Sequence, residues 1–351
     1  MPDAFAEPYA DSPPRDPGAH AIPAAARSAV AGAVALVAED LAAAERTLVA
    51  LLRSDIAEIP DVAGHVALAG GKRLRPLVTL LAARAAGYDA PHRVTIAAVG
   101  ELVHTATLLH DDVVDGGEFR RGRPAARMAY GNGLAVLTGD FCLCSGLVAI
   151  ADSGQLHAYR TLAQTVMRMT EGEVAQLSSA GSVPTRERYY DIVDRKTAAL
   201  IAWCASVGGL CRPQYAEALV RFGTELGYAF QIADDVLDVA PQGADALSVA
   251  GKEAGQDLRD GKVTLPLALA CEADPDLATK VHGALQQGPP LSSQDVLSIL
   301  QGVAATGAAT AARSIAREHA DAACDALASL PDSPARRALH ELAGYVVRRD
   351  R

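Results

Sequence analysis

The sequence predicts an all-α fold, and three observations lead to this class. Half of the 351 residues are hydrophobic, and these are mostly alanine, leucine and valine. Only 4% of the residues are aromatic, and small aliphatic side chains suit closely packed helices better than sheets. From residue 28 onward apolar residues recur at helical spacing, and no segment sustains the alternation of a strand between hairpin turns.

The first 27 residues are expected to form a disordered leader, and residues 28–351 a single helical domain. Six prolines and scattered acids interrupt the leader, which shows no apolar period. It lacks the apolar core of a signal peptide, and its acidic residues do not fit an organelle transit sequence.

Short breaks divide the remaining chain into predicted helices. Residues 28–57 form the first, Pro60 marks a break, and the sequence GGKRLRP at 70–76 begins a helix that runs to about Gly87. The later predicted helices span residues 92–115, 132–152, 155–178, 185–208, 213–239, 263–273, 276–287, 292–305, 308–329 and 332–348. Residues 240–262 are rich in glycine and charge, which predicts a mobile loop.

Charge and cysteine usage narrow the class of protein. With 32 basic and 42 acidic side chains the net charge is −10, which argues against binding nucleic acid by neutralising phosphates. The six cysteines lack the spacing of a zinc site and are expected to be buried, reduced thiols of a cytoplasmic protein. Uncharged runs such as residues 197–211 are shorter than the ~18 residues that a spanning helix requires, so any membrane contact would be peripheral.

Two aspartate triads carry the strongest chemical signal. Each reads Asp-Asp-x-x-Asp within an apolar helical segment, and the first and last members share a helix face. Like charges at this spacing destabilise a helix unless cations bind between them, and oxygen ligands without His or Cys select Mg²⁺. The two triads are Asp111, Asp112 and Asp115, and Asp234, Asp235 and Asp238.

Basic side chains beside the acids indicate a phosphate ligand, because Mg²⁺ held by carboxylates usually keeps positions for substrate oxygens. Arginine offers paired donors to a phosphate and lysine a point charge. The candidates are Lys72, Arg75, Arg120, Arg121, Lys196 with Thr197, Lys252 and Lys262.

Other catalytic sites find less support in the sequence. The chain contains no phosphate-binding Gly-x-x-x-x-Gly-Lys-[Ser/Thr] loop and no recognisable Ser/His/Asp arrangement. A di-iron carboxylate bundle would need two Glu-x-x-His motifs, and Glu101 with His104 forms the only one, so this stays the weaker metal hypothesis.

A series of motifs resembles the trans-prenyl diphosphate synthase (polyprenyl synthetase) family. In order along residues 70–270 they are GGKRLRP, ELVHTATLLHDDVVD, RRGRP, GDF, KTA, FQIADDVLD and GQDLRDGKVTLPL. The C-terminal segment that begins LPDSPARRALHELAGYV is similar to the octaprenyl diphosphate synthase branch, which makes quinone side chains. The resemblance implies a single helical bundle around a central cavity, a homodimer, and Mg²⁺-dependent transfer of an allylic chain to isopentenyl diphosphate.

The resemblance also implies a role for each matching residue. Asp111, Asp115 and Asp234 would hold Mg²⁺, with Asp112, Asp235 and Asp238 in support. The allylic diphosphate would contact Arg120, Lys196, Thr197, Gln231 and Lys252. Isopentenyl diphosphate would contact Lys72, Arg75, His104 and Arg121. The chain departs from the family at Gly116-Gly117, where a more polar pair is commoner, and in residues 240–262, the candidate lid over a site that must exclude water.

Product length in this family depends on the residues four and five positions before the first aspartate, here Thr107 and Ala106. Small residues there imply an open tunnel and a long product, octaprenyl to decaprenyl. Three alternatives remain at this point: a short-chain geranylgeranyl synthase, a class I terpene cyclase, and a non-catalytic subunit of a heteromeric synthase. The cyclase would not need the second triad or the isopentenyl-binding set, and two intact triads count against a non-catalytic subunit.

Overall fold

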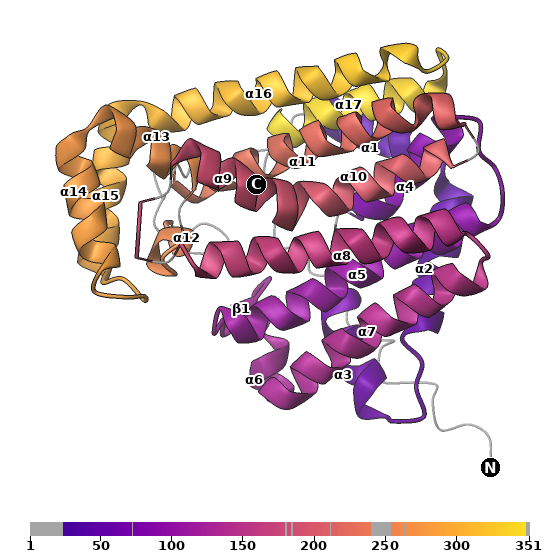
Figure 1. Ribbon diagram of the computed structural model, residues 1–351, viewed down its shortest axis with the longest axis horizontal. Coiled ribbons are helices and arrows are strands. Elements are labelled where there is room, and N and C mark those ends of the chain that lie inside the picture. The colour runs from indigo at the N-terminus through magenta and orange to yellow at the C-terminus, as the bar shows by residue number, and fades with distance from the viewer. Residues whose placement is uncertain are drawn as a thin grey trace.

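The computed structural model describes residues 24–71, 73–179, 181–183, 185–210, 212–239, 254–262 and 264–348. Among these residues the elements are helices apart from one two-stranded hairpin, which confirms the predicted all-α class. Helices α8 (Leu156–Leu177), α10 (Ala199–Ser206), α11 (Ala216–Val239) and α16 (Ala308–Ala326) run roughly side by side across the molecule, and α14 (Pro275–Leu285) with α15 (Ser293–Thr306) stands at one end (Figure 1).

The N-terminal part differs most from the predicted boundaries. It comprises α1 (Ala24–Leu36), α2 (Ala38–Leu51), α3 (Glu58–Ala67) and α4 (Leu74–Ala85). The first helix begins at Ala24 rather than residue 28, because alanines of high helix propensity follow Pro23. Residues 1–23 of the expected leader lie outside the described residues.

The expected break at Pro60 is wrong. Pro60 is the third residue of α3, whereas the preceding helix ends earlier, at Leu51. A proline in the first turn of a helix lacks only an N–H group that has no partner within the helix. The position of this proline therefore permits α3.

The central part places the first triad at the end of a long core helix. It contains α5 (His92–Val114), strands β1 (Phe119–Arg120) and β2 (Arg123–Pro124), α6 (Ala126–Tyr130), α7 (Asn132–Asp152) and α8 (Leu156–Leu177). The sequence did not predict the hairpin, because two-residue strands are too short to show a period. Its turn depends instead on positive φ angles at Arg121 (53°) and Gly122 (74°).

The helix predicted at 185–208 is present but interrupted. It consists of α9 (Arg186–Val193), a single π-helical turn η1 (Asp194–Ala198), α10 (Ala199–Ser206) and a 3₁₀ turn η2 (Val207–Gly209). A second 3₁₀ turn, η3 (Pro213–Tyr215), precedes α11 (Ala216–Val239), which carries the second triad. π-turns inside helices occur frequently at functional sites, and this one contains Lys196 and Thr197.

Apart from the short α12, which lies in the predicted loop, the C-terminal helices agree with the predicted ones to within a few residues. They are α12 (Gln256–Arg259), α13 (Leu265–Ala273), α14 (Pro275–Leu285), α15 (Ser293–Thr306), α16 (Ala308–Ala326), the 3₁₀ turn η5 (Leu327–Ser329) and α17 (Pro334–Arg348). Of the predicted loop and candidate lid at 240–262, residues 240–253 lie outside the described residues, and the remainder contains α12.

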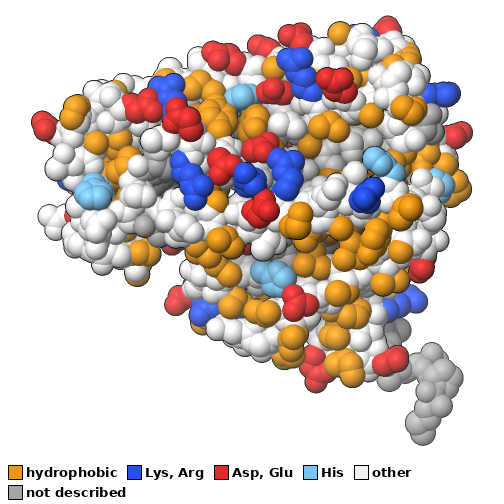
Figure 2. All heavy atoms as spheres, viewed as in Figure 1, with side chains coloured by type: hydrophobic (Ala, Val, Ile, Leu, Met, Phe, Trp, Pro, Cys, Tyr) orange, Lys and Arg blue, Asp and Glu red, His pale blue; other side chains and the backbone are white. Residues whose placement is uncertain are grey.

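Buried aliphatic side chains hold the helices around α5, α10 and α11, and many of them are fully shielded from solvent. Helix α7 is different. It is the single helix in the described ranges that is long and apolar enough to cross a membrane by length and composition, and only a third of its most apolar window is buried. Apolar side chains gather over α7 and α8 on one face of the molecule (Figure 2).

Candidate functional site

A pocket of about 340 Å³ lies between the ends of α5, α8, α9 and α11. Both triads contribute to its lining, together with three basic side chains. The polar residues that line it include Asp111, Asp115, Arg120, Gln176, Tyr189, Lys196, Thr197, Gln231, Asp235, Asp257, Asp260 and Lys262. Residues more than 120 positions apart in the chain therefore form one polar site.

In the first triad each aspartate has a different environment. Asp112 is buried, and its Oδ1 accepts a hydrogen bond from Nε of Arg120 at 2.7 Å. Asp115 accepts one from Nζ of Lys262 at 2.6 Å. Burial raises the pKa of Asp111 to about 6, although nearby Lys196 opposes that shift.

In the second triad Asp235 is the member that lines the pocket. Its carboxylate is buried and accepts hydrogen bonds from the Tyr189 hydroxyl at 2.6 Å, from Nε2 of Gln231 at 2.9 Å and from the Leu265 amide at 3.2 Å. Burial raises the pKa of Asp235 to about 7, even though these hydrogen bonds favour the charged form. Gln231 in turn accepts a hydrogen bond from the Thr197 hydroxyl at 2.9 Å, so α11 and the π-turn are joined at the pocket.

The other two members of the second triad lie outside the pocket lining, as far as the described residues define it. Asp234 is half-buried beside Asp235 on α11. Asp238 accepts hydrogen bonds from the backbone amides of Gln256 and Asp257, at 3.1 and 3.3 Å. This aspartate therefore attaches the segment that carries α12 to the end of α11.

The basic residues that were predicted to hold the second substrate form a group of their own. Burial and the surrounding arginines, Arg75 first among them, lower the pKa of His104 well below its ordinary value, so the imidazole is neutral. Nε of Arg75 is buried without a hydrogen-bond partner. The guanidinium of Arg121 lies against the backbone at Gly71. Lys72 and Lys252, predicted members of the site, lie outside the described residues.

Arg73 and Arg121 are the non-glycine residues with positive φ among the described residues, at 47° and 53°. Such angles are uncommon for a residue with a Cβ and concentrate at functional sites. Arg73 is held by Glu45 and Glu101, with shortest distances of 2.5 and 3.1 Å. This ion pair also weakens the di-iron hypothesis, because Glu101 is occupied by an arginine and His104 faces further arginines.

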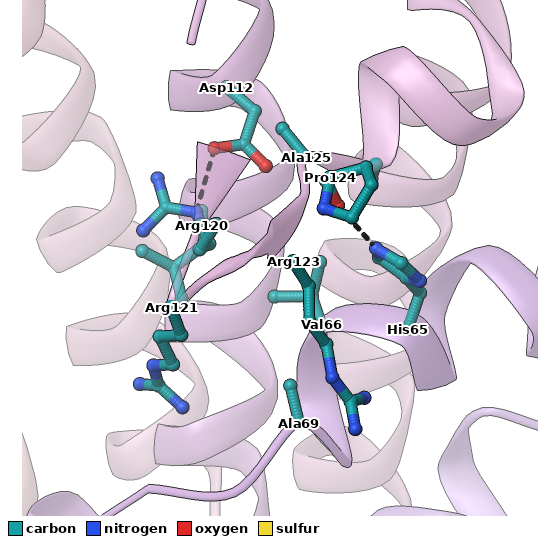
Figure 3. A pocket seen from close by; sticks show the side chains of 11 residues that line it. His65, Val66, Ala69, Asp112, Arg120, Arg121, Arg123, Pro124 and Ala125 are labelled. Atoms are coloured by element: carbon teal, nitrogen blue, oxygen red, sulfur yellow. Dashed lines mark hydrogen bonds and ion pairs between the residues drawn. The ribbon is translucent and has the colours of Figure 1, made fainter. Parts of the chain in front are cut away.

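The β1–β2 hairpin positions two of these basic residues (Figure 3). The ring of His65 on α3 contacts the Pro124 carbonyl oxygen at 2.8 Å, while Arg120 points to Asp112. The Arg121 side chain extends away from Asp112. The tight turn thus directs Arg120 to the pocket of the aspartate triads and Arg121 to the group formed by Arg75 and His104.

The two residues predicted to govern product length lie on α5, about one turn before the first triad. Ala106 is fully buried in the core. Thr107 is half-buried, and its hydroxyl donates to the His104 carbonyl oxygen at 2.8 Å.

Lys262 was a candidate phosphate ligand without a specific role in the sequence analysis, and Tyr189 and Glu173 were not assigned from the sequence at all. Lys262 lines the pocket, and Asp115 raises its pKa although burial opposes the charge. The Tyr189 hydroxyl donates a hydrogen bond to Asp235, and Glu173 on α8 forms an ion pair with Lys196 at 2.5 Å. The motif GQDLRDGK already contained Lys262, but the partners of Tyr189 and Glu173 depend on contacts between distant helices.

The carboxylates suit a magnesium ion whose remaining coordination positions are filled by oxygens of the substrate. All candidate donors are oxygens, and Oδ2 of Asp112 is buried without a partner. In the part of the chain that the structure describes, no three His, Cys, Asp or Glu side chains are already grouped to hold a metal ion. Mg²⁺ is usually held by one or two carboxylates plus substrate phosphates, and the adjacent bases would accept those phosphates.

Comparison with known proteins gives one consistent result. The polyprenyl synthetase family model matches residues 57–301. The chain is 39% identical to the octaprenyl diphosphate synthase of Escherichia coli over 322 residues, covering 90% of this chain and 98% of that protein.

Two solved structures are similar over nearly the whole chain. One is a polyprenyl synthase from Caulobacter crescentus complexed with calcium and isoprenyl diphosphate, and the other a decaprenyl diphosphate synthase from Rhodobacter capsulatus. Each has a TM-score of 0.85 and 38% identity, and each comparison covers 92% of this chain. The shared part covers 98% and 99% of those two chains, respectively.

Proposed function

The chain belongs to the polyprenyl synthetase family and is a trans-prenyltransferase, and we propose that it builds a long all-trans polyprenyl diphosphate. The reaction joins isopentenyl diphosphate head-to-tail to an allylic diphosphate, farnesyl or geranylgeranyl diphosphate, until the product reaches octaprenyl to decaprenyl length. The observation that carries the proposal is the single pocket in which carboxylates of both triads meet three basic side chains.

The acids of the two triads bind the metal or support its site. Asp111, Asp115 and Asp234 would hold Mg²⁺, and Asp112, Asp235 and Asp238 fix the surrounding bases and backbone. Bound Mg²⁺ supplies Lewis-acid stabilisation of the charge on a departing diphosphate.

The basic and polar residues bind and orient the allylic diphosphate. Lys196, Thr197, Arg120, Gln231 and the undescribed Lys252 are the proposed contacts, and Lys262 joins them because it lines the same pocket. They stabilise the negative charge that develops when the allylic C–O bond breaks and its electron pair leaves with the diphosphate.

The second basic group receives isopentenyl diphosphate. Arg75 and Arg121 with the undescribed Lys72 supply positive charge, and neutral His104 supplies a hydrogen-bonding imidazole without adding a further charge. The double bond of this substrate attacks the allylic cation, and a proton is then lost to the released diphosphate. No side-chain base is required in this scheme, so the protein's task is to bind, align and exclude water.

The size of one residue on α5 and the named relatives favour a long-chain product over the short-chain alternative. Ala106, fully buried on α5, is small at the position where a bulky side chain in this family would close the product tunnel. Two of the relatives named above are an octaprenyl and a decaprenyl diphosphate synthase, and a quinone side chain made in the cytoplasm is the proposed use of the product. Both triads are intact, which favours a catalytic chain over a non-catalytic subunit.

A homodimer through α7 and α8 is part of the proposal. On α7 the apolar residues Leu134, Leu137, Phe141, Cys144 and Val148 follow one another at intervals of three and four, and Leu137 and Val148 are 65% and 59% exposed. This heptad spacing suits a partner helix. Asp140, exposed in the middle of α7, disfavours a lipid environment.

The dimer is tested by the mass of the protein in solution. Leu137→Glu should convert a dimer to a monomer in sedimentation experiments, while Leu297→Glu, at an exposed site on α15, should not. A wild-type monomer would contradict the proposed dimer.

The function is tested by incubating the purified chain with isopentenyl diphosphate, farnesyl diphosphate and Mg²⁺ and chromatographing the products. We expect octaprenyl to decaprenyl chains, and none after chelation of the metal. A geranylgeranyl product, a cyclic hydrocarbon, or no product without a second subunit would each support one of the three alternatives.

A further inference from the structure

Helix α8 contacts the π-turn at Gly172, where the two backbones come close. A Cβ built on Gly172 would lie 2.8 Å from both Cβ of Arg195 and the backbone nitrogen of Lys196. The residues on either side of this glycine are both acidic, and each pairs with one of two successive bases. Glu171 contacts Arg195 at 2.7 Å, and Glu173 contacts Lys196 at 2.5 Å.

The two ion pairs differ in where they lie. Glu171 is 51% exposed, and its pair with Arg195 faces solvent. The side chains of Glu173 and Lys196 are 19% and 24% exposed, and Lys196 lines the pocket. Oε1 of Glu173 is buried with no hydrogen-bond partner. Glu173 therefore contributes a carboxylate with unused bonding capacity at the edge of the pocket, outside both aspartate triads.

We propose that Glu173 is an internal counterion that holds Lys196 in the resting site and gives it up to the diphosphate of the substrate. This inference rests on the proposed function, because it takes the ligand of Lys196 to be a diphosphate. When the diphosphate leaves, Glu173 takes the ammonium group back. No bond other than this ion pair changes.

This exchange has a cost in affinity and an advantage in turnover. A diphosphate must displace Glu173 from Lys196, and the carboxylate also repels the anion, so Glu173 weakens diphosphate binding. Chain elongation releases one diphosphate in every round, and a counterion that recaptures Lys196 favours that release. The resting ion pairs Arg120–Asp112 and Lys262–Asp115 also hold bases of the site, but their carboxylates belong to the first triad.

The test measures binding of inorganic diphosphate in the presence of Mg²⁺ by titration calorimetry. Glu173→Gln keeps the shape of the side chain but removes its charge, and it should lower the dissociation constant by about two- to fivefold, the range for losing one partly exposed ion pair. Glu171→Gln, on the other side of Gly172, is the matched control and should leave the dissociation constant unchanged. In a Lys196→Gln background the added Glu173→Gln change should have a much smaller effect.

Inhibition of chain elongation by added diphosphate gives the second measurement. Glu173→Gln should be inhibited at a correspondingly lower diphosphate concentration than the wild type. Glu173→Ala should act in the same direction, and the unfolding temperatures of all variants verify that the fold is retained.

Unchanged or weaker diphosphate binding in folded Glu173→Gln would overturn the inference, since Glu173 would then only support Lys196. Failure of the wild-type protein to bind diphosphate with Mg²⁺ would contradict the diphosphate site itself and, with it, this role of Glu173. Normal wild-type binding with no change in the variant would contradict the role of Glu173 alone.

Discussion

Asp111, Asp112 and Asp115 lie within about one turn at the C-terminal end of α5, yet each has different surroundings and a different task. Asp112 is buried against Arg120, Asp115 is paired with Lys262, and Asp111 lines the pocket as a carboxyl of raised pKa. The spacing of the triad predicts that acids gather on one face. It does not predict which base each acid meets, because Arg120 and Lys262 come from a hairpin and from a loop about 150 residues later.

Asp235 provides a pH-dependent prediction at this scale. Its pKa is about 7 in the folded protein and near 4 in an unfolded chain, so between these values the folded state binds a proton that the unfolded state does not. The stability that this group contributes is complete below about pH 4 and is lost as the pH rises through about 7. Its ionisation costs a few kcal/mol at most, from about 1.4 kcal/mol per pKa unit.

Asp235→Asn removes this ionisation. In metal-free buffer the difference in unfolding temperature between the variant and the wild type should therefore shift in favour of the variant between pH 5 and pH 8. Asp257→Asn, which changes another acid in the lining of the same pocket, is the control. A difference that stays constant with pH would show that Asp235 is already ionised at pH 5.

At the scale of helices and strands, the period of apolar residues predicts long elements but not short ones. The long periodic helices, α5, α7 and α11 among them, were predicted within two or three residues, because their periods extend over several turns. The hairpin at 119–124 and the π-turn at 194–198 were not predicted. Both are too short to carry a period, and both carry basic residues of the site. Their form depends on contacts with α3, α8 and α11.

Gly227 on α11 marks one such contact. A Cβ there would lie 2.5 Å from Cα of Ala198, the last residue of the π-turn. Gly227→Ala should therefore move the π-turn, lengthen the bond between Thr197 and Gln231, and cost about 1–3 kcal/mol of stability, the usual range for overpacking.

Urea denaturation with a turnover assay measures both effects. Gly283→Ala on α14, where an added Cβ meets nothing within 4 Å, is the control and should be neutral or stabilising by up to about 1 kcal/mol. Full stability and turnover in Gly227→Ala would mean that the contact between α11 and the π-turn is not required.

For the whole molecule, the helices bring together side chains that the sequence separates widely, and the pocket forms at the ends of α5, α8, α9 and α11. Several residues of the motifs, which match a known family, line this pocket, and the family match covers residues 57–301. The exposed apolar face of α7 was not predicted as a surface, because periodicity alone does not say whether an apolar side is covered. Net charge gave no indication of a site that binds anions, because its bases are a small share of the 32 in the chain.

The product tunnel gives a prediction for the molecule as a whole. Ala106→Phe places an aromatic ring on α5 where the growing chain is proposed to pass, and it should shift the products to shorter lengths in chromatography. Ala106→Ser keeps the side chain small and should leave the product lengths unchanged. Unaltered lengths in a folded, active Ala106→Phe variant would remove Ala106 from the tunnel.

The central claim is that the two aspartate triads form one metal-dependent site for chain elongation. It is tested most directly by the rate at which Asp111→Ala incorporates isopentenyl diphosphate into longer chains in the presence of Mg²⁺. We expect a loss of at least about a hundredfold in turnover, the effect of losing several kcal/mol of transition-state stabilisation, with the unfolding temperature nearly unchanged. Near-normal turnover by this variant would contradict the account.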